Sequence, residues 1–568
     1  MLRQYVKLET LRRVPLPTFL AVAYAAGLAY VLLLPDLSQE FYVDENALVI
    51  HSIQSAMAPG DVADAFGSDA PNATSPSVRA FLDRLLSPHG IVVREFDRDI
   101  HYAVLRSRRS NGEDSIAIVA PYHPHVAFKR ALSGLHVAVA LLTYLNAVKW
   151  LAKDVILVCV PAARPALLSK WLDAYHAVYS GEAPTGAHLP LDRAGSIRAA
   201  FVIDLPPSTS FETLSLTTSS SHGILPNFDI VAVVQYVTAQ HNVPISISDN
   251  YAGLLQSSSR RDDALQWFNR YRPMLRFMAD SVTGAFSGMH GPFIEYNIDA
   301  VSLVARGARV DGRLKTSAYL AVARALEESV RAFSNCIEKL HHSSFLYIVT
   351  STTKLVTFSV YYWAIIVLGL PFALQVLQRV PDQLPLSEMP PAVVAFTVLY
   401  AAMAAMRFGV ALADSAVAAL AIWAGIAVVS VIVCWRMLRG RHLSLIWLQS
   451  LVHTATVVIC VSFSVVNFTM TLALMFFMLP FVLAFPCRTR FETVRRYTVL
   501  GVCNPLVLLV VVGLLIDASP VTLLYRFVVL APTSDHLIFP MVFSMYIPQC
   551  VIAVVGAFAS PDRRPHAD

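Results

Sequence analysis

Residues 17–35 read PTFLAVAYAAGLAYVLLLP, an uncharged apolar run that decides the architecture of this chain. A membrane-spanning helix needs about 20 apolar residues to cross roughly 30 Å of hydrocarbon. The run meets that length, and no clear small-residue cleavage site follows it, so we expect an uncleaved signal anchor. The first transmembrane helix is therefore predicted at 17–35, after a cytosolic N-terminus at 1–16.

Similar apolar runs return only in the last 40% of the chain. Their approximate bounds are 348–373, 391–412, 415–437, 443–466, 468–486, 497–516 and 538–558. The sequence thus predicts eight transmembrane helices. The domains are a large domain at 36–345, a membrane domain with seven helices at 346–560 and a cytosolic C-terminus at 561–568.

The composition agrees with a membrane protein. Hydrophobic residues make up 56% of the 568 residues and charged residues only 15%, with a mean hydropathy of +0.55; soluble domains carry about 25% charged residues. The net charge of +5 lies entirely in residues 345–568, where 13 Lys and Arg face 8 Asp and Glu. No basic stripe of the kind that binds nucleic acid is present, so nucleic acid is excluded as a partner.

Basic residues flank the predicted spans on one side of the membrane, which sets the orientation. Positive residues precede the first span and acidic residues follow it, so residues 36–345 are expected in the lumen. With eight alternating spans, the cytosolic flanks of the later spans hold ten arginines, whereas the short luminal loops hold only Arg526. The ten are Arg379, Arg436, Arg439, Arg441, Arg488, Arg490, Arg495, Arg496, Arg563 and Arg564. The acceptor sequence at Asn72 is predicted to be glycosylated on the luminal side. The one at Asn467 lies in a tight turn at the membrane edge and is expected to stay unmodified.

The region between the spans alternates short β-branched runs with helical stretches. The runs are 115–119, 155–160, 200–203 and 300–304, and the helical stretches are 127–150, 165–179, 264–285 and 315–341. This alternation predicts an α/β domain with a mostly parallel sheet. Ligands of such sheets bind beyond the carboxyl ends of the strands.

Three metal-capable side chains stand at such strand ends or in loops. His123 follows the first run, Asp204 ends the third, and His290 lies in a later loop. They are candidate metal ligands, with ordinary loop histidines and a capping aspartate as the alternative. The seven cysteines include no CxxC pair, and Cys336 is expected on a helix as an unreactive thiol. The segment 219–222, Ser-Ser-Ser-His, lacks a GxSxG elbow and is interpreted as a polar loop.

Polar residues and prolines inside the predicted spans are candidates for lipid contact, because burying a polar group in a membrane is costly. Packing kinks and snorkelling side chains are the alternatives. Within the spans, the candidates for lipid binding are Arg407, His453, Asn504 and Pro548. Arg526 is a further candidate in the luminal loop 518–536, whose apolar run is too short to span a membrane and is interpreted as interfacial or re-entrant.

Several segments carry a family resemblance. They run in order from Phe41–Leu48 (FYVDENAL) through Trp150–Asp154, Lys170–His176, Arg193–Ile197, Leu225–Asp229 and Gly288–Phe293 to Glu338–His341. With these segments and its one-then-seven layout of spans, the chain resembles the family of GPI anchor attachment subunits of the glycosylphosphatidylinositol (GPI) transamidase. The resemblance implies an endoplasmic reticulum membrane protein and a luminal domain similar to di-zinc exopeptidases.

The same resemblance implies a non-catalytic role. His123, Asp204 and His290 match zinc ligands of the peptidases, but Arg130 falls near the bridging aspartate, and Ala162 and Ala163 fall at the paired glutamates. Alanine neither ligates a metal nor accepts a proton, so no cofactor is required, and one residual divalent metal is the alternative.

The expected function is a transamidase subunit that presents the GPI lipid and scaffolds its partners. The implied partners are other subunits including a caspase-like cysteine protease, the GPI lipid, the C-terminal signal of the proprotein and membrane lipids. A membrane-anchored luminal zinc exopeptidase and a lipid transporter or scramblase are the alternatives.

Overall fold

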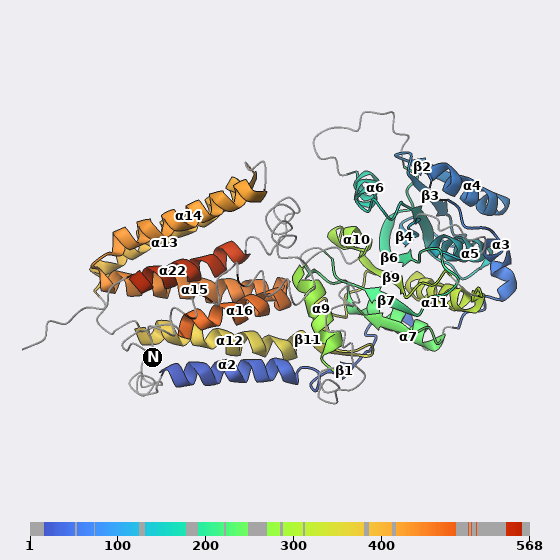
Figure 1. The fold of residues 1–568 in the computed structure, drawn as a ribbon. Helices are drawn as coiled ribbons and strands as arrows, with labels where there is room; N and C mark the ends of the chain where they lie inside the picture. The colour runs from blue at the N-terminus through green and yellow to red at the C-terminus, as the bar shows by residue number, and fades with distance from the viewer. Residues whose placement is uncertain are drawn as a thin grey trace, which may run out of the picture.

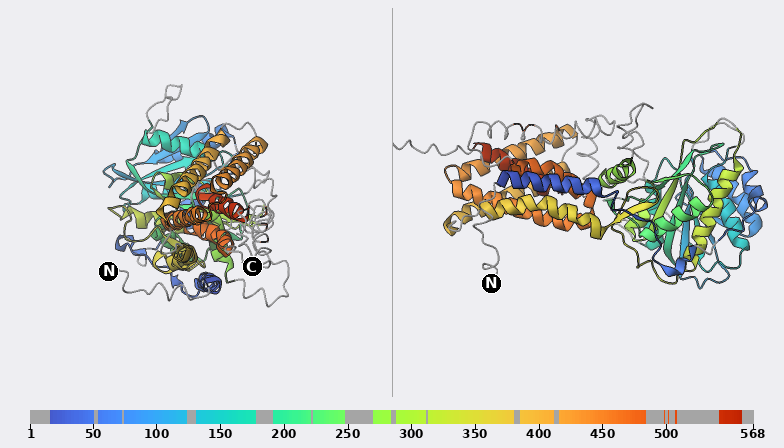
Figure 2. Two further views of the ribbon diagram at one scale, coloured as in Figure 1. Left: turned by 90° about the vertical axis from the view of Figure 1, so that its left-hand side faces the viewer. Right: turned by 90° about the horizontal axis from the view of Figure 1, so that it is seen from below.

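The computed structural model has an α/β domain at one end and a bundle of long apolar helices, the helical domain, at the other (Figures 1 and 2). It describes residues 16–50, 54–72, 74–123, 131–177, 191–220, 223–247, 270–283, 288–310, 313–379, 385–411, 416–483, 498, 501, 507 and 541–558.

The α/β domain is built on one eight-stranded sheet. Its strands are β2 (Val93–Phe96), β3 (Ile100–Leu105), β4 (Asp114–Val119), β5 (Asp154–Cys159), β6 (Ser196–Asp204), β7 (Thr213–Thr217), β8 (Ile245–Ile247) and β9 (Asp299–Arg306). They lie in the order β2-β3-β5-β4-β6-β9-β7-β8. The central strands β5, β4, β6 and β9 are mutually parallel, whereas β3 and β7 pair antiparallel with this core. The predicted α/β fold with a mostly parallel sheet is confirmed.

Helices cover both faces of the sheet. On one face α5 (Gly134–Ala147), α7 (Phe228–Gln240) and α11 (Thr316–Ser334) share a core with inward residues such as Ile116 and Leu157. On the other face α6 (Ala166–His176) and α10 (Gly291–Glu295) pack on alternate residues such as Ile156. A strand buried on both faces consists almost wholly of apolar residues, which explains why β4 and β5 are visible in the sequence.

The start of α5 lies unusually close to the sheet. A Cβ on Gly134 would lie 2.2 Å from the backbone oxygen of Ile203 in β6. Glycine therefore permits this helix to begin directly on the sheet.

Shorter elements complete the α/β domain. They are η2 (Asn46–Leu48), η4 (Pro59–Val62), α3 (Ala63–Phe66), α4 (Ser75–Leu86) and η5 (Ser87–His89), together with α9 (Arg272–Thr283), which lies against the helical domain (Figure 1).

The helical domain contains α2 (Leu16–Leu33), α12 (Phe358–Arg379), η7 (Leu386–Glu388), α13 (Met389–Ala411), α14 (Ala416–Leu438), α15 (His442–Val466), α16 (Phe468–Leu483) and α22 (Ile547–Phe558), the last preceded by the π-helical turn η9 (Val542–Tyr546). Four stretches, Phe358–Val376, Leu386–Met406, Ala421–Leu438 and Leu443–Val466, are long and apolar enough to cross a membrane, and three shorter apolar helices, Val22–Leu33, Phe468–Met478 and Ser544–Gly556, accompany them in this domain. The predicted span at 497–516 lies almost entirely outside the described residues, so the total of eight remains a prediction.

Two predicted boundaries are wrong. The second apolar helix begins at Phe358 rather than at 348, because β10 (Tyr347–Val349) and β11 (Lys354–Thr357) form a small sheet with β1 (Gln39–Glu40) in the order β1-β11-β10. The helix expected at 315–341 ends at Ser334, so Cys336 follows the helix instead of lying on it.

Candidate functional site

The carboxyl ends of β4 and β6 bring two of the predicted metal ligands together. His123 follows β4, Asp204 is the last residue of β6, and these two strands are parallel neighbours. The Nε2 atom of His123 lies 2.6 Å from Oδ1 of Asp204, and both side chains are partly exposed. The sequence reasoning that strand ends meet at one edge is correct for this pair.

The third predicted ligand lies elsewhere. His290 precedes α10, is fully buried, and places Nδ1 2.8 Å from Oγ of Ser302 in the middle of β9. Burial lowers the pKa of His290 to about 4, against the raising effect of the nearby Thr218 and Ser219 backbone. Within the described part of the chain, His123, Asp204 and His290 do not form a group whose ligand atoms lie within 4.8 Å of one another.

The side chains around His123 do not fit a two-metal centre. Such a centre needs bridging and terminal carboxylates that share a hydroxide. Ala162 and Ala163 follow β5 at the same edge of the sheet, and Arg164 after them forms an ion pair with Asp99 at 2.7 Å. Arg130 lies outside the described residues. The described geometry offers one histidine–aspartate pair where a di-zinc peptidase needs a full ligand set.

The predicted inert thiol and polar loop lie in buried surroundings. Cys336 is buried, its Sγ lies 3.9 Å from the carbonyl oxygen of Ala332, and burial, followed by the charge of Glu45, raises the pKa of its thiol to about 12. Ser220 donates to the carbonyl oxygen of Gly291 at 3.1 Å. Ser221 and His222 lie outside the described residues.

The membrane candidates separate into described and undescribed positions. His453 on α15 is buried, with Nδ1 3.1 Å from Nε2 of Gln549 on α22. Pro548 is the second residue of α22, directly after the π-helical turn. Arg407 lies on α13, but its side chain is outside the described part. Asn504 and Arg526 lie outside the described residues.

A polar contact missed by the sequence reasoning joins the two domains. Asn467 separates α15 from α16 and is 2% exposed. Its Nδ2 donates to the carbonyl oxygen of Ser281 on α9 at 2.9 Å, and its Oδ1 accepts from the backbone N–H of Met470 at 3.0 Å. The side chain thus caps α16 and binds the α/β domain simultaneously.

A cavity of about 170 Å³ lies beside this contact. Phe277, Tyr347, Tyr361 and Asn467 are among the residues that line it, so it lies between the α/β domain and the ends of the apolar helices.

The segments that carry the family resemblance meet at the same junction. Asp229 at the start of α7 accepts from the backbone N–H of Asp44 at 2.9 Å and of Glu45 at 3.1 Å. Asn227 donates to the carbonyl oxygen of Ser343 at 3.1 Å. Residues that follow α2 and residues that precede α12 are therefore both bound to the start of α7. In the sequence, the order of these motifs was the only sign that they meet at the start of α7.

The predicted glycosylation site is accessible. Asn72 is exposed, and its backbone N–H donates to Oγ of Ser77 at 3.1 Å. Modification of Asn72 stays a prediction. The amide of Asn467, by contrast, is buried in the contact with Ser281.

Comparisons with known proteins agree with the resemblance. A family described as "Gaa1-like, GPI transamidase component" matches residues 99–381, which extend from the β3 region into the region after α12. GPI transamidase component gaa1 of Schizosaccharomyces pombe is 24% identical over 60% of this chain and 62% of its own length. GPI transamidase component GAA1 of Saccharomyces cerevisiae is 24% identical over 48% of this chain and 41% of its own length. The chain thus spans less than two thirds of the length of either relative.

Among solved structures, the LapA aminopeptidase of Legionella pneumophila aligns with 53% of this chain and 78% of its own, at 8% identity and a TM-score of 0.31. A similarity of that extent says nothing about chemistry. Over residues 99–381 and in both yeast relatives, the similarity points to one family: the chain resembles the Gaa1-like GPI transamidase components.

Proposed function

We propose that this chain is a non-catalytic subunit of a GPI transamidase complex in the endoplasmic reticulum membrane. The observation that carries the proposal is its similarity to the Gaa1-like family, combined with a strand-end site that has alanines at 162 and 163 where a di-zinc peptidase has carboxylates. A side chain without a lone pair can neither hold a metal nor move a proton.

The proposed contribution is positioning. The complex joins a proprotein, after removal of its C-terminal signal, to a preassembled GPI lipid, and the nucleophile belongs to a separate caspase-like subunit. This chain presents the lipid through its apolar helices and scaffolds partner subunits or the proprotein on its α/β domain. Holding two reactants in a fixed orientation lowers a barrier without any side-chain chemistry.

The proposed topology has both termini in the cytosol and the α/β domain in the lumen. The charge pattern of the flanks supports this arrangement. The hydrogen bond from Asn467 to Ser281 on α9 also supports this topology, because it holds the α/β domain at one end of the apolar helices (Figure 2).

A residual divalent metal, if one binds near the strand ends, has two donors there, His123 and Asp204, because His290 lies apart from them. Two protein ligands make a weak site. We therefore propose that the transamidase role of this chain does not depend on a metal at this position.

Complementation tests the proposal. Cells lacking the chain are expected to lose attachment of GPI to a reporter protein, and the wild-type chain restores it. The double variant His123→Ala with Asp204→Asn should restore attachment equally well, because neither side chain takes part in chemistry. Normal attachment without the chain would exclude the subunit role, and failure of the well-folded double variant would exclude the non-catalytic one.

A further inference from the structure

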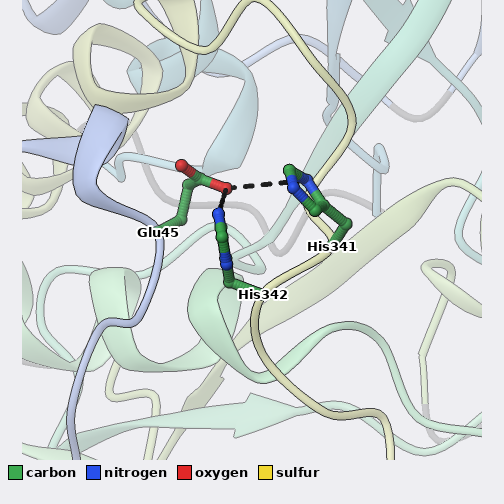
Figure 3. Close-up of side chains that lie close together, drawn as sticks. All are labelled: Glu45, His341 and His342. Atoms are coloured by element: carbon green, nitrogen blue, oxygen red, sulfur yellow. Dashed lines mark ion pairs between the residues drawn. The ribbon is translucent and has the colours of Figure 1, made fainter.

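Three side chains with metal-binding atoms lie side by side near the base of the α/β domain, away from the strand-end site. Glu45 follows α2 and β1, whereas His341 and His342 lie between α11 and β10 (Figure 3). One carboxylate oxygen and one nitrogen from each ring all lie within 4.8 Å of one another. Among the described residues, these three form the group of His, Cys, Asp or Glu side chains whose ligand atoms lie close enough to share one metal ion.

The carboxylate of Glu45 is held in place by the fold. Its backbone N–H donates to the buried Asp229, and its Oε1 accepts from the backbone N–H of Ala47 at 3.5 Å, as the cap of η2. Oε2 therefore faces the histidines, 3.9 Å from Nδ1 of His341 and 3.9 Å from Nε2 of His342. The Glu45 side chain is only 14% exposed, so little conformational freedom remains to be lost when an ion binds.

The two imidazoles approach this oxygen from the solvent side. Their ring centroids are 4.3 Å apart, and each side chain is about half exposed. Nδ1 of His341 also lies 3.0 Å from the carbonyl oxygen of Lys339. This is the same nitrogen that faces Glu45, so a metal bound through Nδ1 would replace the contact with Lys339.

We infer that Glu45, His341 and His342 form a binding site for a divalent transition metal of the zinc class. Two imidazoles and a carboxylate suit Zn²⁺, and a fourth position is left for water. Ligand bonds of 2.0–2.2 Å place tetrahedral ligand atoms roughly 3.4 Å apart, so each glutamate–histidine distance must shorten by about 0.5 Å. Small rotations of the two exposed rings supply this change, and the capped glutamate stays where it is.

An ion at this site would join the two chain segments that connect the α/β domain to α2 and to α12. Glu45 lies on the segment that leaves α2, and the histidines lie on the segment that leads through β10 and β11 into α12. A shared metal would cross-link both connections between the α/β domain and the apolar helices. The inference is independent of the proposed transamidase role, since it rests on these ligands alone.

Metal titration of the purified full-length chain in detergent tests this inference. Zn²⁺ is followed by calorimetry, and Co²⁺ by its visible absorption, which reports the ligand geometry. We expect one ion per chain at this site, and at least about tenfold weaker binding for Glu45→Gln, His341→Ala and His342→Ala. Glu45→Gln is informative because its amide oxygen retains the cap of η2.

Two controls make the outcome decisive. His89→Asn removes an exposed imidazole outside the cluster and should leave the affinity unchanged, while His123→Ala separates this site from the strand ends. The inference is wrong if the chain binds no ion at micromolar concentrations, which would leave a glutamate–histidine ion pair only. It is also wrong if His89→Asn or His123→Ala abolishes binding while the three cluster variants, folded by circular dichroism, retain it.

Discussion

Replacing Asn467 with alanine should loosen the contact between the two domains. The substitution deletes the cap of α16, worth about 1 kcal/mol and at most about 2 kcal/mol. It also leaves the buried carbonyl oxygen of Ser281 without this donor, which costs about 1–3 kcal/mol. Together the two losses amount to about 2–4 kcal/mol of local stability. Because about 1.4 kcal/mol is a factor of ten, opening at the junction should become roughly 30- to 700-fold more frequent.

Hydrogen exchange of the purified chain in detergent measures this opening. We expect faster exchange in α9 and in the first turn of α16, and unchanged exchange in the central strands β4 and β6. Asn467→Asp is the matched variant: its carboxylate still caps α16 but cannot donate to Ser281. It should therefore loosen α9 more than α16.

A second substitution approaches the same contact from the other side. A Cβ on Gly223 would lie 2.3 Å from Nδ2 of Asn467, and its φ of +74° already disfavours any other residue. Gly223→Ala should reproduce the exchange pattern of Asn467→Ala. Wild-type exchange in both variants would refute the assignment of this contact as the link between the domains.

Three further predictions concern packing, pH and the apolar helices. Gly134→Ala should lower the free energy of unfolding by about 1–3 kcal/mol, because its Cβ would lie 2.2 Å from a backbone oxygen. Gly425→Ala is the control, since a Cβ there meets nothing within 4 Å. Thermal unfolding compares the two variants, and equal midpoints would contradict the tight contact at Gly134. Burial lowers the pKa of His136 to about 4, so between pH 6.5 and 4 the unfolded chain binds more protons than the folded one. The stability that is present above pH 6.5 should therefore fall across this range, by up to roughly 3 kcal/mol. His136→Gln, which keeps a capping side chain at the third position of α5, should flatten that pH profile in denaturant titrations, and an unchanged profile would contradict this origin. Gln549→Leu removes hydrogen bonds to His453 and Thr456 and should lower the thermal midpoint in detergent modestly, by an amount corresponding to about 0.5–2 kcal/mol; no shift would mean that this polar contact adds no stability.

The sequence predicted the parts of the fold in which local pattern and burial agree. The apolar runs at 115–119 and 155–160 became β4 and β5, because a central parallel strand is buried on both faces. The small sheet of β1, β11 and β10 was missed because its register joins Gln39 to Leu355, and nothing near either residue signals the other. The β-branched residues before Phe358 suit a strand and a membrane span equally well, so the predicted start of the second span was wrong.

The residue types of the candidate site could be predicted from the sequence, but the burial of each side chain could not. His123 and Asp204 end neighbouring strands, so parallel topology alone brings them together. His290 lies in the loop before α10. The way this loop packs against β9 places its ring beside Ser302 and away from His123 and Asp204. Glu45 and His341 were recognised only as parts of separate motifs, because their proximity depends on how the chain closes at the base of the α/β domain.

The pairing of β1 with β11 has a consequence for synthesis. Gln39 leaves the ribosome more than 300 residues before its partner Leu355, and at 5–20 residues per second that interval lasts roughly 15–60 s. During this time β1 has no partner strand, and α12, against which α2 packs, has not yet been made. The final closure of the α/β domain is therefore a late event, timed by translation. Chains arrested before Leu355 would expose an unpaired edge at Gln39–Glu40, a place where a folding factor could recognise an unfinished subunit.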